Sequence, residues 1–427
     1  MKMKPYWLDT ATPSGDYTET PIPRQVDLAV VGAGFTGLST AYHAAKAGLT
    51  VAVLEANTVV WGASGRNGGM STNGLGIGFT SAIKRFGEQK AKEYIDLYND
   101  AVDLIESIVT ENNLDVDFGR RGKLILAAKE SHVPGLHRTK DALERVAGHR
   151  VHMIEGAQLR DEIGSDVFPA AIVEQDSADL HVAKFGHALA GLAVKEGATI
   201  HEHAAVTAVK RLGKGTAHEL TTTRGKIRAD KVVVGTSGYT GKPFGWMQRR
   251  VMPVGSFIVG TEQLSDELVS ELIPNRRTCS DTKNLLNYFR LSPDNRLLFG
   301  GRAQFALSDP ESDKKSGEIL VKRMHEVFPQ LRDTRIDYMW GGLVDISMDR
   351  MVHAGIHNGL YYSMGYSGHG VQMAIYMGRA MAEVVQGNEK ANPWRDLKNP
   401  WVPFYFGKPG LHLKIGGTYY EYQDRKS

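Results

Sequence analysis

The chain has almost no cysteine. Cys279 is the only one among 427 residues, which excludes an internal disulfide, a cysteine-rich zinc site and an iron–sulfur cluster. Histidine is more frequent, with 15 residues, yet no HExxH motif occurs, and His201 and His203 alternate as residues of a strand do. The sequence therefore predicts no metal site.

The sequence also lacks long apolar runs and a dominant charge. No run of about 18 consecutive apolar residues occurs, so we expect no transmembrane helix, and the polar residues 1–24 lack the apolar centre of a signal peptide. A net charge of +3 without a clustered basic face argues against a nucleic-acid partner. These absences favour a cytoplasmic enzyme, and the length allows two or three domains.

The stretch Val26–Glu55 carries the clearest motif. Leu28–Val31 is apolar and strand-like, and a GxGxxG motif at residues 32–37 follows it without a gap. Helical spacing over Phe35–Ala47 and a second apolar strand over Thr50–Leu54 complete the pattern. A strand, a glycine-rich turn, a helix and a strand that ends in an acid form the βαβ unit of dinucleotide-binding proteins.

Each residue of this motif has a mechanical role. Gly32 allows the tight turn, Gly34 lets the backbone approach a pyrophosphate, and Gly37 lets the helix pack closely on the strand. Glu55, 18 residues after Gly37, is placed to accept hydrogen bonds from both ribose hydroxyls, and its charge disfavours the 2′-phosphate of NADP. The unit by itself leaves FAD and NAD open. The residues expected at the dinucleotide are Gly32, Gly34, Phe35, Thr36, Gly37, Glu55 and Ala56.

A second glycine-rich stretch, WGASGRNGGM at residues 61–70, follows the βαβ unit. Its small residues suit a backbone that runs close to a large flat ligand. Together, GAGFTGLS, Glu55 and GASGRNGG resemble the family of FAD enzymes that includes D-amino-acid oxidase, sarcosine oxidase and glycine oxidase. The resemblance implies that this early loop lies along the ribityl chain and the isoalloxazine ring of FAD. It assigns these contacts to Ala63, Ser64, Arg66, Asn67, Gly68, Gly69 and Met70.

A third glycine-rich turn, GYSGHGV at residues 365–371, opens a helix expected over Gln372–Gln386. Such a turn offers N–H groups and a positive helix end to the electron-rich edge of a reduced flavin. The family has this turn at the flavin, which implies contacts from Gly365, Gly368, His369, Gly370 and Val371. The resemblance also implies that Val206 meets the adenine and that Thr236 and Gly238 lie under the FAD. The order of these segments favours FAD over NAD.

The resemblance further implies noncovalent FAD. Sarcosine oxidases link the flavin to a cysteine near the third turn, and dimethylglycine dehydrogenases link it to a histidine in the early loop. In this sequence, residues 340–371 contain no cysteine and residues 61–70 contain no histidine.

The expected fold class is α/β (α+β), with a Rossmann-type FAD-binding domain interleaved with a substrate domain built on a mixed or antiparallel sheet. Periodicity predicts one long helix over residues 81–113 and one strand over residues 199–211. Trp7 and the aromatic tail, with Tyr419, Tyr420 and Tyr422, are expected to pack on the body. The expected boundaries are 25–80, 155–240 and 341–386 for the FAD-binding domain, 81–154 and 241–340 for the substrate domain, 1–24 for an N-terminal arm and 387–427 for the tail.

The reaction implied by the resemblance is oxidation of the C–N bond of a polar primary or secondary amine, by hydride transfer to flavin N5. The substrate ammonium must first lose a proton, because the nitrogen lone pair has to assist departure of the hydride. The products are an imine, then an aldehyde plus an amine or ammonia. Molecular oxygen or another acceptor takes the electrons. In sarcosine oxidases, a lysine on one strand near the flavin helps oxygen to react. The matching strand has no lysine here, so either Arg302 supplies the positive charge for the reaction with oxygen, or the enzyme is a dehydrogenase.

The substrate class follows from one departure from the family. Glycine and D-amino-acid oxidases hold the substrate carboxylate with an arginine at a position that corresponds here to Val344. Valine cannot bind a carboxylate, which disfavours a simple α-amino acid. The segment WGGLVDISMDR instead resembles the branch that oxidises γ-glutamylputrescine, in which the amine is distant from the carboxylate. The substrate candidates are Tyr288, Arg302, His353 and Tyr366, and the catalytic candidates are His369, Tyr366 and Arg302.

Three alternatives stay open at this point. The protein could oxidise glycine, sarcosine or another N-substituted amino acid. It could bind flavin without turnover, or it could be the flavin subunit of a larger dehydrogenase. Flavin reduction by amines, with or without peroxide formation, separates these cases, and a homo-oligomer is compatible with each of them.

Overall fold

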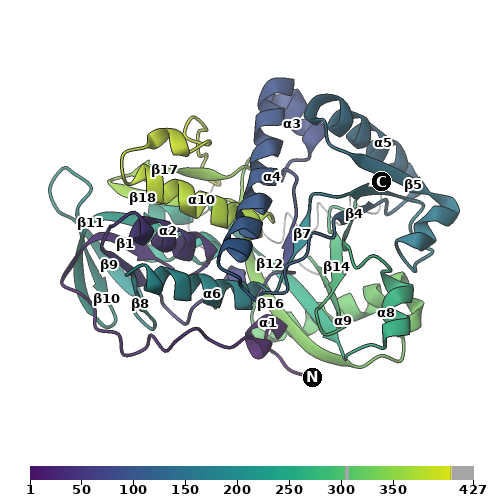
Figure 1. Ribbon diagram of the computed structural model, residues 1–427, viewed down its shortest axis with the longest axis horizontal. Coiled ribbons are helices and arrows are strands. Elements are labelled where there is room, and N and C mark those ends of the chain that lie inside the picture. The colour runs from purple at the N-terminus through teal and green to yellow at the C-terminus, as the bar shows by residue number, and fades with distance from the viewer. Residues whose placement is uncertain (303–306, 404, 406–427) are drawn as a thin grey trace.

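Two eight-stranded sheets lie side by side and share the chain between them (Figure 1). The structure is a computed structural model that describes residues 1–302, 307–403 and 405. The chain passes back and forth between the sheets, so neither sheet is built from one continuous segment. This interleaved architecture confirms the expected fold class.

The first sheet is mainly parallel. It contains β1 (Gln25–Val31), β2 (Val51–Leu54), β8 (Thr199–His201), β9 (Val206–Arg211), β10 (His218–Thr222), β11 (Gly225–Val234), β17 (His353–His357) and β18 (Leu360–Met364). The order is β17-β18-β11-β1-β2-β8, and β9 and β10 extend it as an antiparallel ribbon on β11. Leu28–Val31 of β1 and all of β2 are buried. Such unbroken apolar runs are typical of parallel strands in a sheet interior.

Three helices, α2 (Phe35–Lys46), α6 (Val182–Lys195) and α10 (Gly370–Val384), lie across this sheet, with α2 packed between the other two (Figure 1). α2 and α10 approach closely at Gly378, where an added Cβ would lie 2.4 Å from the Cβ of Ser39. Each of these two helices begins at a glycine-rich turn. Their packing therefore brings the first and third turns to the same side of the molecule.

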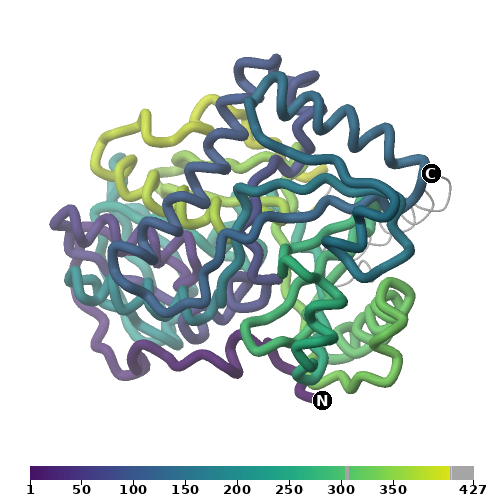
Figure 2. The backbone as a smooth tube through the Cα atoms, turned by 45° about the vertical axis from the view of Figure 1, so that its right-hand side comes forward, coloured from purple at the N-terminus to yellow at the C-terminus, as the bar shows by residue number. Residues whose placement is uncertain are grey.

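The second sheet contains, in order across the sheet, β16 (Ile336–Ser347), β12 (Val251–Thr261), β15 (Leu297–Gly301), β14 (Asn287–Leu291), β13 (Thr278–Asp281), β4 (Lys123–Leu126), β6 (Ala170–Glu174) and β5 (Val151–Glu155). Neighbouring strands in this sheet are antiparallel, except β4 and β13, which are parallel to each other. The remaining long helices are α3 (Phe79–Phe86), α4 (Glu88–Glu111), α5 (Val133–Ala142), α8 (Asp266–Leu272) and α9 (Pro310–Val327). α3 and α5 lie on the upper side of the molecule in Figure 1, and α8 and α9 lie on the lower side. α4 runs from the upper side toward the first sheet, where it packs on α10 (Figure 1, Figure 2). A separate short ladder pairs β3 (Met70–Ser71) with β7 (Ala178–Asp179).

After two of the expected domain boundaries, at residues 155 and 341, the chain still contributes strands to the second sheet. β6 lies in a segment assigned to the FAD-binding domain, yet it pairs with β4 and β5 of the second sheet. β16 likewise stays paired with β12 as far as Ser347. Hydrogen bonds between strands distant in sequence set these limits, and no local pattern marks them.

Two expected elements are each broken by a residue with positive φ. The helix expected over residues 81–113 is divided into α3 and α4 at Gly87, whose φ is +81°. The strand expected over residues 199–211 is divided into β8 and β9, and His203 between them has a φ of +54°. A positive φ ends a right-handed helix or an extended strand, so the periodicity on each side does not continue across it.

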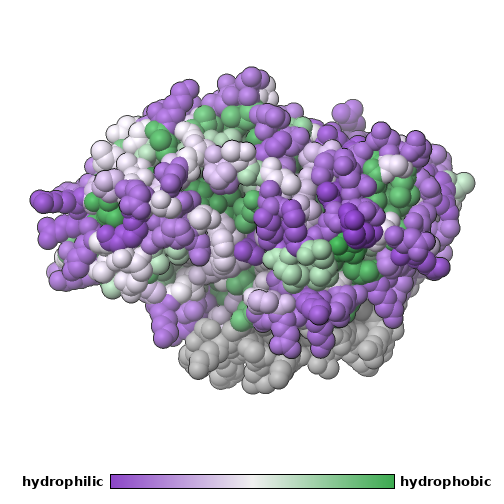
Figure 3. All heavy atoms as spheres, turned by 90° about the horizontal axis from the view of Figure 1, so that it is seen from below, coloured by the Kyte–Doolittle hydropathy of each residue, from purple (hydrophilic) through white to green (hydrophobic). Residues whose placement is uncertain are grey.

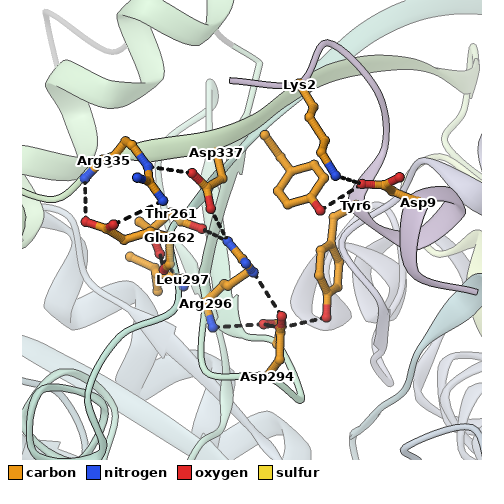
Figure 4. A network of polar contacts seen from close by, with 12 residues as sticks. Lys2, Tyr6, Asp9, Thr261, Glu262, Asp294, Arg296, Leu297, Arg335 and Asp337 are labelled. Carbon is orange, nitrogen blue, oxygen red and sulfur yellow. Dashed lines mark hydrogen bonds and ion pairs between the residues drawn. The ribbon is translucent and has the colours of Figure 1, made fainter.

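The N-terminal arm is tied to the second sheet by a polar network (Figure 4). Tyr6 donates a hydrogen bond to Asp294 at 2.6 Å. Arg296 then bridges Asp294 at 2.9 Å and Asp337 at 2.7 Å. Lys2 pairs with Tyr338 in an isolated bridge next to Asp337, so the first residues of the chain run beside β16.

Two tryptophans anchor the arm and the beginning of the tail. Trp7 is fully buried, and its Nε1–H donates to the Asn67 carbonyl at 2.7 Å. Trp394 is also fully buried and stacks on Tyr94 of α4, with ring centroids 4.5 Å apart. The expected packing of Trp7 is confirmed, whereas the tyrosines at 419–422 lie outside the described residues.

The surface seen in Figure 3 is mostly hydrophilic, with apolar residues in small separate groups. Large apolar side chains that are exposed, such as Ile356 and Trp401, are few beside the buried core. In the described part of the chain, no helix combines the length and the apolar character needed to cross a membrane.

Arg290 of β14 connects the second sheet to the early glycine-rich loop. Its side chain is 2% exposed and pairs with the Asp179 carboxylate at 2.5 Å. The same guanidinium donates to the carbonyl oxygens of Gly69 at 2.6 Å and Leu180 at 3.0 Å. One buried group therefore fixes both strands of the β3–β7 ladder to the second sheet.

Replacing Arg290 by leucine is expected to lower the free energy of unfolding by about 3 kcal/mol, because the buried Asp179 charge and the Gly69 carbonyl lose a partner. Denaturant unfolding followed by circular dichroism measures the change. Arg335→Leu is the matched control, because Arg335 also has acidic partners but its side chain is 69% exposed. Equal losses of stability in the two variants would contradict the role assigned to Arg290.

Candidate active site

A cavity of about 840 Å³ lies between the two sheets and connects the three glycine-rich segments. Most of the predicted site residues line it. They are Gly32, Gly34, Phe35, Thr36, Glu55, Ala56, Ala63, Ser64, Arg66, Asn67, Gly68, Met70, Val206, Thr236, Tyr288, Arg302, Tyr366, Gly368, His369, Gly370 and Val371. Five predicted site residues are not among the described residues that line the cavity: Gly37, Gly69, Gly238, Gly365 and His353.

The first glycine-rich turn packs against the start of α2. A Cβ at Gly37 would lie 1.8 Å from the Gly32 carbonyl oxygen, so only glycine fits there. Gly32 has a φ of +101°, which also favours glycine. α2 follows Gly34 without a local side-chain cap, which leaves backbone N–H groups at a positive helix end beside the cavity. Such groups bind a pyrophosphate.

Glu55 lies just after β2, where the sequence predicts a ribose contact. Its Oε2 accepts a hydrogen bond from the Ala33 N–H at 2.7 Å, and its Oε1 accepts one from the Asn57 N–H at 2.8 Å. Burial raises the pKa of this carboxyl group, and the N–H groups oppose the shift by stabilising its charged form. The carboxylate is held beside the first turn and keeps lone pairs for ribose hydroxyls.

The early loop contacts both sheets. Ser64 Oγ accepts a hydrogen bond from the Phe35 N–H of α2 at 2.9 Å. Arg66 donates to the Trp61 carbonyl at 2.8 Å and to the Gly341 carbonyl of β16 at 3.2 Å. These bonds fix the loop along the cavity, and a long cofactor needs such a supported wall.

Asp345 of β16 holds the third glycine-rich turn. Its carboxylate accepts hydrogen bonds from the N–H groups of Gly365 at 2.6 Å and Tyr366 at 3.3 Å. Burial raises the pKa of Asp345 to about 6, although these bonds favour the charged form. Asp345 was not among the predicted site residues, because neither of the two aspartates of WGGLVDISMDR is marked by a local pattern that indicates this contact.

His369 and Tyr366, two predicted catalytic residues, are buried in the third turn. Burial, helped by the nearby Lys123 charge, lowers the pKa of His369 to about 4, so its ring is neutral at physiological pH. The Tyr366 hydroxyl lies 2.7 Å from Thr36 Oγ1 and 2.9 Å from Ser363 Oγ. These bonds join the third turn to α2, which gives Tyr366 a positioning role.

The predicted substrate residues fall into two groups. Tyr288 and Arg302 line the cavity from the second sheet, and Tyr366 lines it from the third turn. His353 is buried outside the described lining, and its Nε2 lies 2.8 Å from Asp349 Oδ1. The structure therefore brings the first three residues together around one cavity and gives His353 a different partner.

Four residues absent from the predictions form a buried group on the cavity wall, which we call the polar cluster: Asn73, Lys123, His149 and Glu174. Lys123 of β4 donates to the Asn73 carbonyl, and its Nζ lies 3.9 Å from Glu174 Oε2. Asn73 donates through its side chain to Glu174, and Asn99 joins Asn73 to His149. These residues come from separate elements, so no sequence spacing could have indicated the cluster.

Two residues of the polar cluster, His149 and Glu174, have the composition of a metal site together with Asp176. Possible ligand atoms of His149, Glu174 and Asp176 lie within 4.8 Å of one another. However, the Glu174 carboxylate already accepts a hydrogen bond from Ser177 at 2.8 Å, and the Lys123 amino group lies 3.9 Å away. Hydrogen bonds from Asn73 and Ser177 already engage the Glu174 carboxylate, so a hydrogen-bonded network explains the cluster better.

A Rossmann-type sheet, three glycine-rich segments on one cavity and a second sheet beside it define a flavin-dependent oxidoreductase. The family model described as DAO, FAD dependent oxidoreductase, matches residues 27–384. The chain belongs to this family and is an FAD-dependent oxidoreductase that acts on the CH–NH bonds of amine or amino-acid substrates.

Individual relatives span almost the whole chain. It is 32% identical to the probable oxidoreductase OrdL of Haemophilus influenzae, over 99% of this chain and 97% of that protein. It is also 32% identical to the γ-glutamylputrescine oxidoreductase of Escherichia coli, over 93% of each chain. The solved structure of glycine oxidase from Geobacillus kaustophilus has a TM-score of 0.74 at 20% identity and covers 90% of this chain and 99% of its own. This last likeness shows a shared fold.

The cavity fits FAD. A Cβ at Gly34 would lie 3.0 Å from Ser64 Oγ, and one at Gly68 would lie 3.1 Å from the Tyr288 ring, so glycines keep the wall open at both places. The first turn and Glu55 would hold the adenine dinucleotide, and the third turn would hold the flavin. Bound FAD supplies a two-electron oxidant to this site.

Replacing Gly37 by alanine is expected to abolish FAD binding, because the added Cβ has no room beside the Gly32 carbonyl. Flavin absorbance per mole of purified protein should fall to a small fraction of the wild-type value. Gly245→Ala is the control, since Gly245 has a φ of −56° and a Cβ there meets no atom within 4 Å. A full flavin content in Gly37→Ala would contradict the assigned role of the first turn.

Proposed function

We propose that the protein oxidises a polar primary or secondary amine whose carboxylate is distant from the reacting nitrogen, as in γ-glutamylputrescine. The supporting observation is the segment 342–346 of β16, which lines the cavity and borders the third turn. This segment has Val344 among its apolar residues and one acid, Asp345, whose carboxylate is bonded to the turn. It offers no cation to hold a carboxylate next to the reacting carbon.

Positive side chains lie elsewhere on the cavity wall. Lys283 and Arg302 line the cavity from the second sheet, and Arg350 lines it from the segment after β16. In the proposed complex, side chains from this set bind the distant carboxylate, and arginine can do so through two parallel hydrogen bonds. The identity of 32% with a γ-glutamylputrescine oxidoreductase over 93% of each chain supports this substrate class.

The proposed reaction breaks the C–H bond next to nitrogen and forms an imine, which water converts to an aldehyde plus an amine or ammonia. The protein orients the amine and excludes water, and no covalent bond to a side chain is required. Molecular oxygen or another acceptor completes the cycle. Peroxide formation after oxygen is admitted identifies an oxidase.

Anaerobic mixing with paired amines tests the substrate class. γ-Glutamylputrescine is expected to bleach the flavin absorbance at least about 100-fold faster than glycine, sarcosine or D-alanine, because segment 342–346 offers no cation for an α-carboxylate. Faster bleaching by the amino acids would mean that another basic residue binds an α-carboxylate, and the proposal would fail.

We also propose that the FAD is bound noncovalently. Cys279 is the only cysteine in the chain, and burial raises the pKa of its thiol, which disfavours the reactive thiolate. Acid precipitation is therefore expected to release the flavin into the supernatant, where its absorbance is measured. Flavin that remains with the denatured protein would show a covalent link.

A further inference from the structure

Lys123 extends from β4 into the cavity wall close to the third turn. Its Nζ donates to the Asn73 carbonyl and lies 3.9 Å from Glu174 Oε2, beyond hydrogen-bond distance. A Cβ at Gly74 would lie 3.3 Å from Lys123 Nζ and 4.0 Å from His369 Cε1. Lys123 Nζ and the ring of His369, the residue that precedes α10, therefore both lie next to Gly74, at the end of the cavity where we expect the flavin.

Ionisable groups face Lys123 from each element packed against it. Glu174 of β6 and Asp176 after it are acidic, His149 belongs to the polar cluster, and His369 is neutral at physiological pH. Burial lowers the pKa of Lys123, and the charges of Glu174 and Asp176 oppose the shift. A lysine in this setting gives up its proton more readily than a lysine in water.

The proposed chemistry needs a group that accepts a proton. The ammonium of an alkylamine has a pKa near that of free lysine, so it reaches the site mostly protonated at neutral pH. Two other groups of the wall have partners within the protein: Asp345 is bonded to the third turn, and the Tyr366 hydroxyl is bonded to Thr36. Within the described residues, the Asn73 carbonyl is the hydrogen-bond partner of Lys123 Nζ, and the cavity lies beyond it.

We propose that Lys123 accepts a proton from the ammonium group of the bound substrate. The inference rests on the proposed function, because it requires an amine substrate. One substrate N–H bond breaks, the lone pair of Lys123 Nζ forms a new N–H bond, and the substrate nitrogen keeps its electron pair. The lysine becomes an ammonium 3.9 Å from the Glu174 carboxylate, whose charge stabilises it.

Anaerobic reduction of the FAD-loaded enzyme by γ-glutamylputrescine, followed by stopped-flow across a range of pH, tests this step. The wild-type rate is expected to reach a plateau above the pKa of Lys123. In Lys123→Met the rate at the pH where the wild-type plateau begins should fall about tenfold for each pH unit between that pH and the pKa of the substrate amine. It should then rise about tenfold per pH unit toward the pKa of the substrate amine. Lys123→Arg should behave like Lys123→Met, because arginine keeps its charge and does not release a proton.

Two comparisons separate proton transfer from a structural effect. A substrate analogue with fluorine on the carbon next to the amine-bearing carbon has a more acidic ammonium, so it should restore much of the lost rate in Lys123→Met. Lys92→Met is the matched control. Lys92 lies on α4 outside the cavity lining and pairs with Asp96 at 2.9 Å, so this variant should keep the wild-type pH profile.

Binding of an amine that lacks hydrogens on its α-carbon gives a readout without turnover. The nitrogen chemical shift of a ¹⁵N-labelled amine of this kind reports whether the bound nitrogen is an amine or an ammonium. At the plateau pH, the bound nitrogen should be neutral in the wild type, because the proton moves to Lys123. In Lys123→Met it should stay an ammonium.

Three outcomes would overturn the proposal. A wild-type pH profile in Lys123→Arg would show that a positive charge at this position is sufficient for flavin reduction and that no proton transfer to Lys123 is needed. A rate in Lys123→Met that is lowered by the same factor at every pH would indicate a binding or structural role. If no amine reduced the wild-type flavin, the proposed function would fail first, and this step would fail with it.

Discussion

The Asp345 carboxylate accepts hydrogen bonds from the backbone of the third glycine-rich turn, and the geometry of the active site depends on this contact. Asp345 belongs to the second sheet, whereas the turn leads from β18 of the first sheet into α10. The contact therefore sets where the substrate side of the cavity meets the cofactor side. Tyr366 extends it to α2 through Thr36, so the first and third turns keep a fixed separation. A cofactor that reaches from one turn to the other requires that separation.

Acidic and basic side chains have different tasks in this cavity. The carboxylates of Glu55, Asp345 and Glu174 accept hydrogen bonds from backbone or side-chain groups of the protein, so they organise the wall. A buried carboxylate without such partners would be costly, and each of these is satisfied within the described structure. Basic side chains also line the cavity, among them Lys123, Lys283, Arg302 and Arg350. An amine substrate with a distant carboxylate suits this division, because it brings both a proton to give up and a negative charge to bind.

The βαβ unit and the three glycine-rich segments could be predicted from sequence, because each depends on backbone geometry within a few residues. Gly37 is an example, since its neighbour Gly32 lies in the same motif. Lys123 and Glu174 could not be predicted, because the pairing of β4 with β6 brings them together from distant segments. His353 shows the opposite case: it lies close to the third turn in sequence, yet its hydrogen bond goes to Asp349. Strand pairing, which local periodicity does not report, accounts for these differences.

The anchoring of the early loop has a consequence for biosynthesis. Arg66 donates to the Gly341 carbonyl, a residue 275 positions later in the chain, and Trp340 donates to the Arg66 carbonyl at 2.9 Å. The βαβ unit emerges from the ribosome long before these partners have been made. FAD therefore meets a complete binding site only after β16 and the third turn have been synthesised. A nascent chain that stops before β16 carries the dinucleotide motif without the cavity that makes it a flavin site.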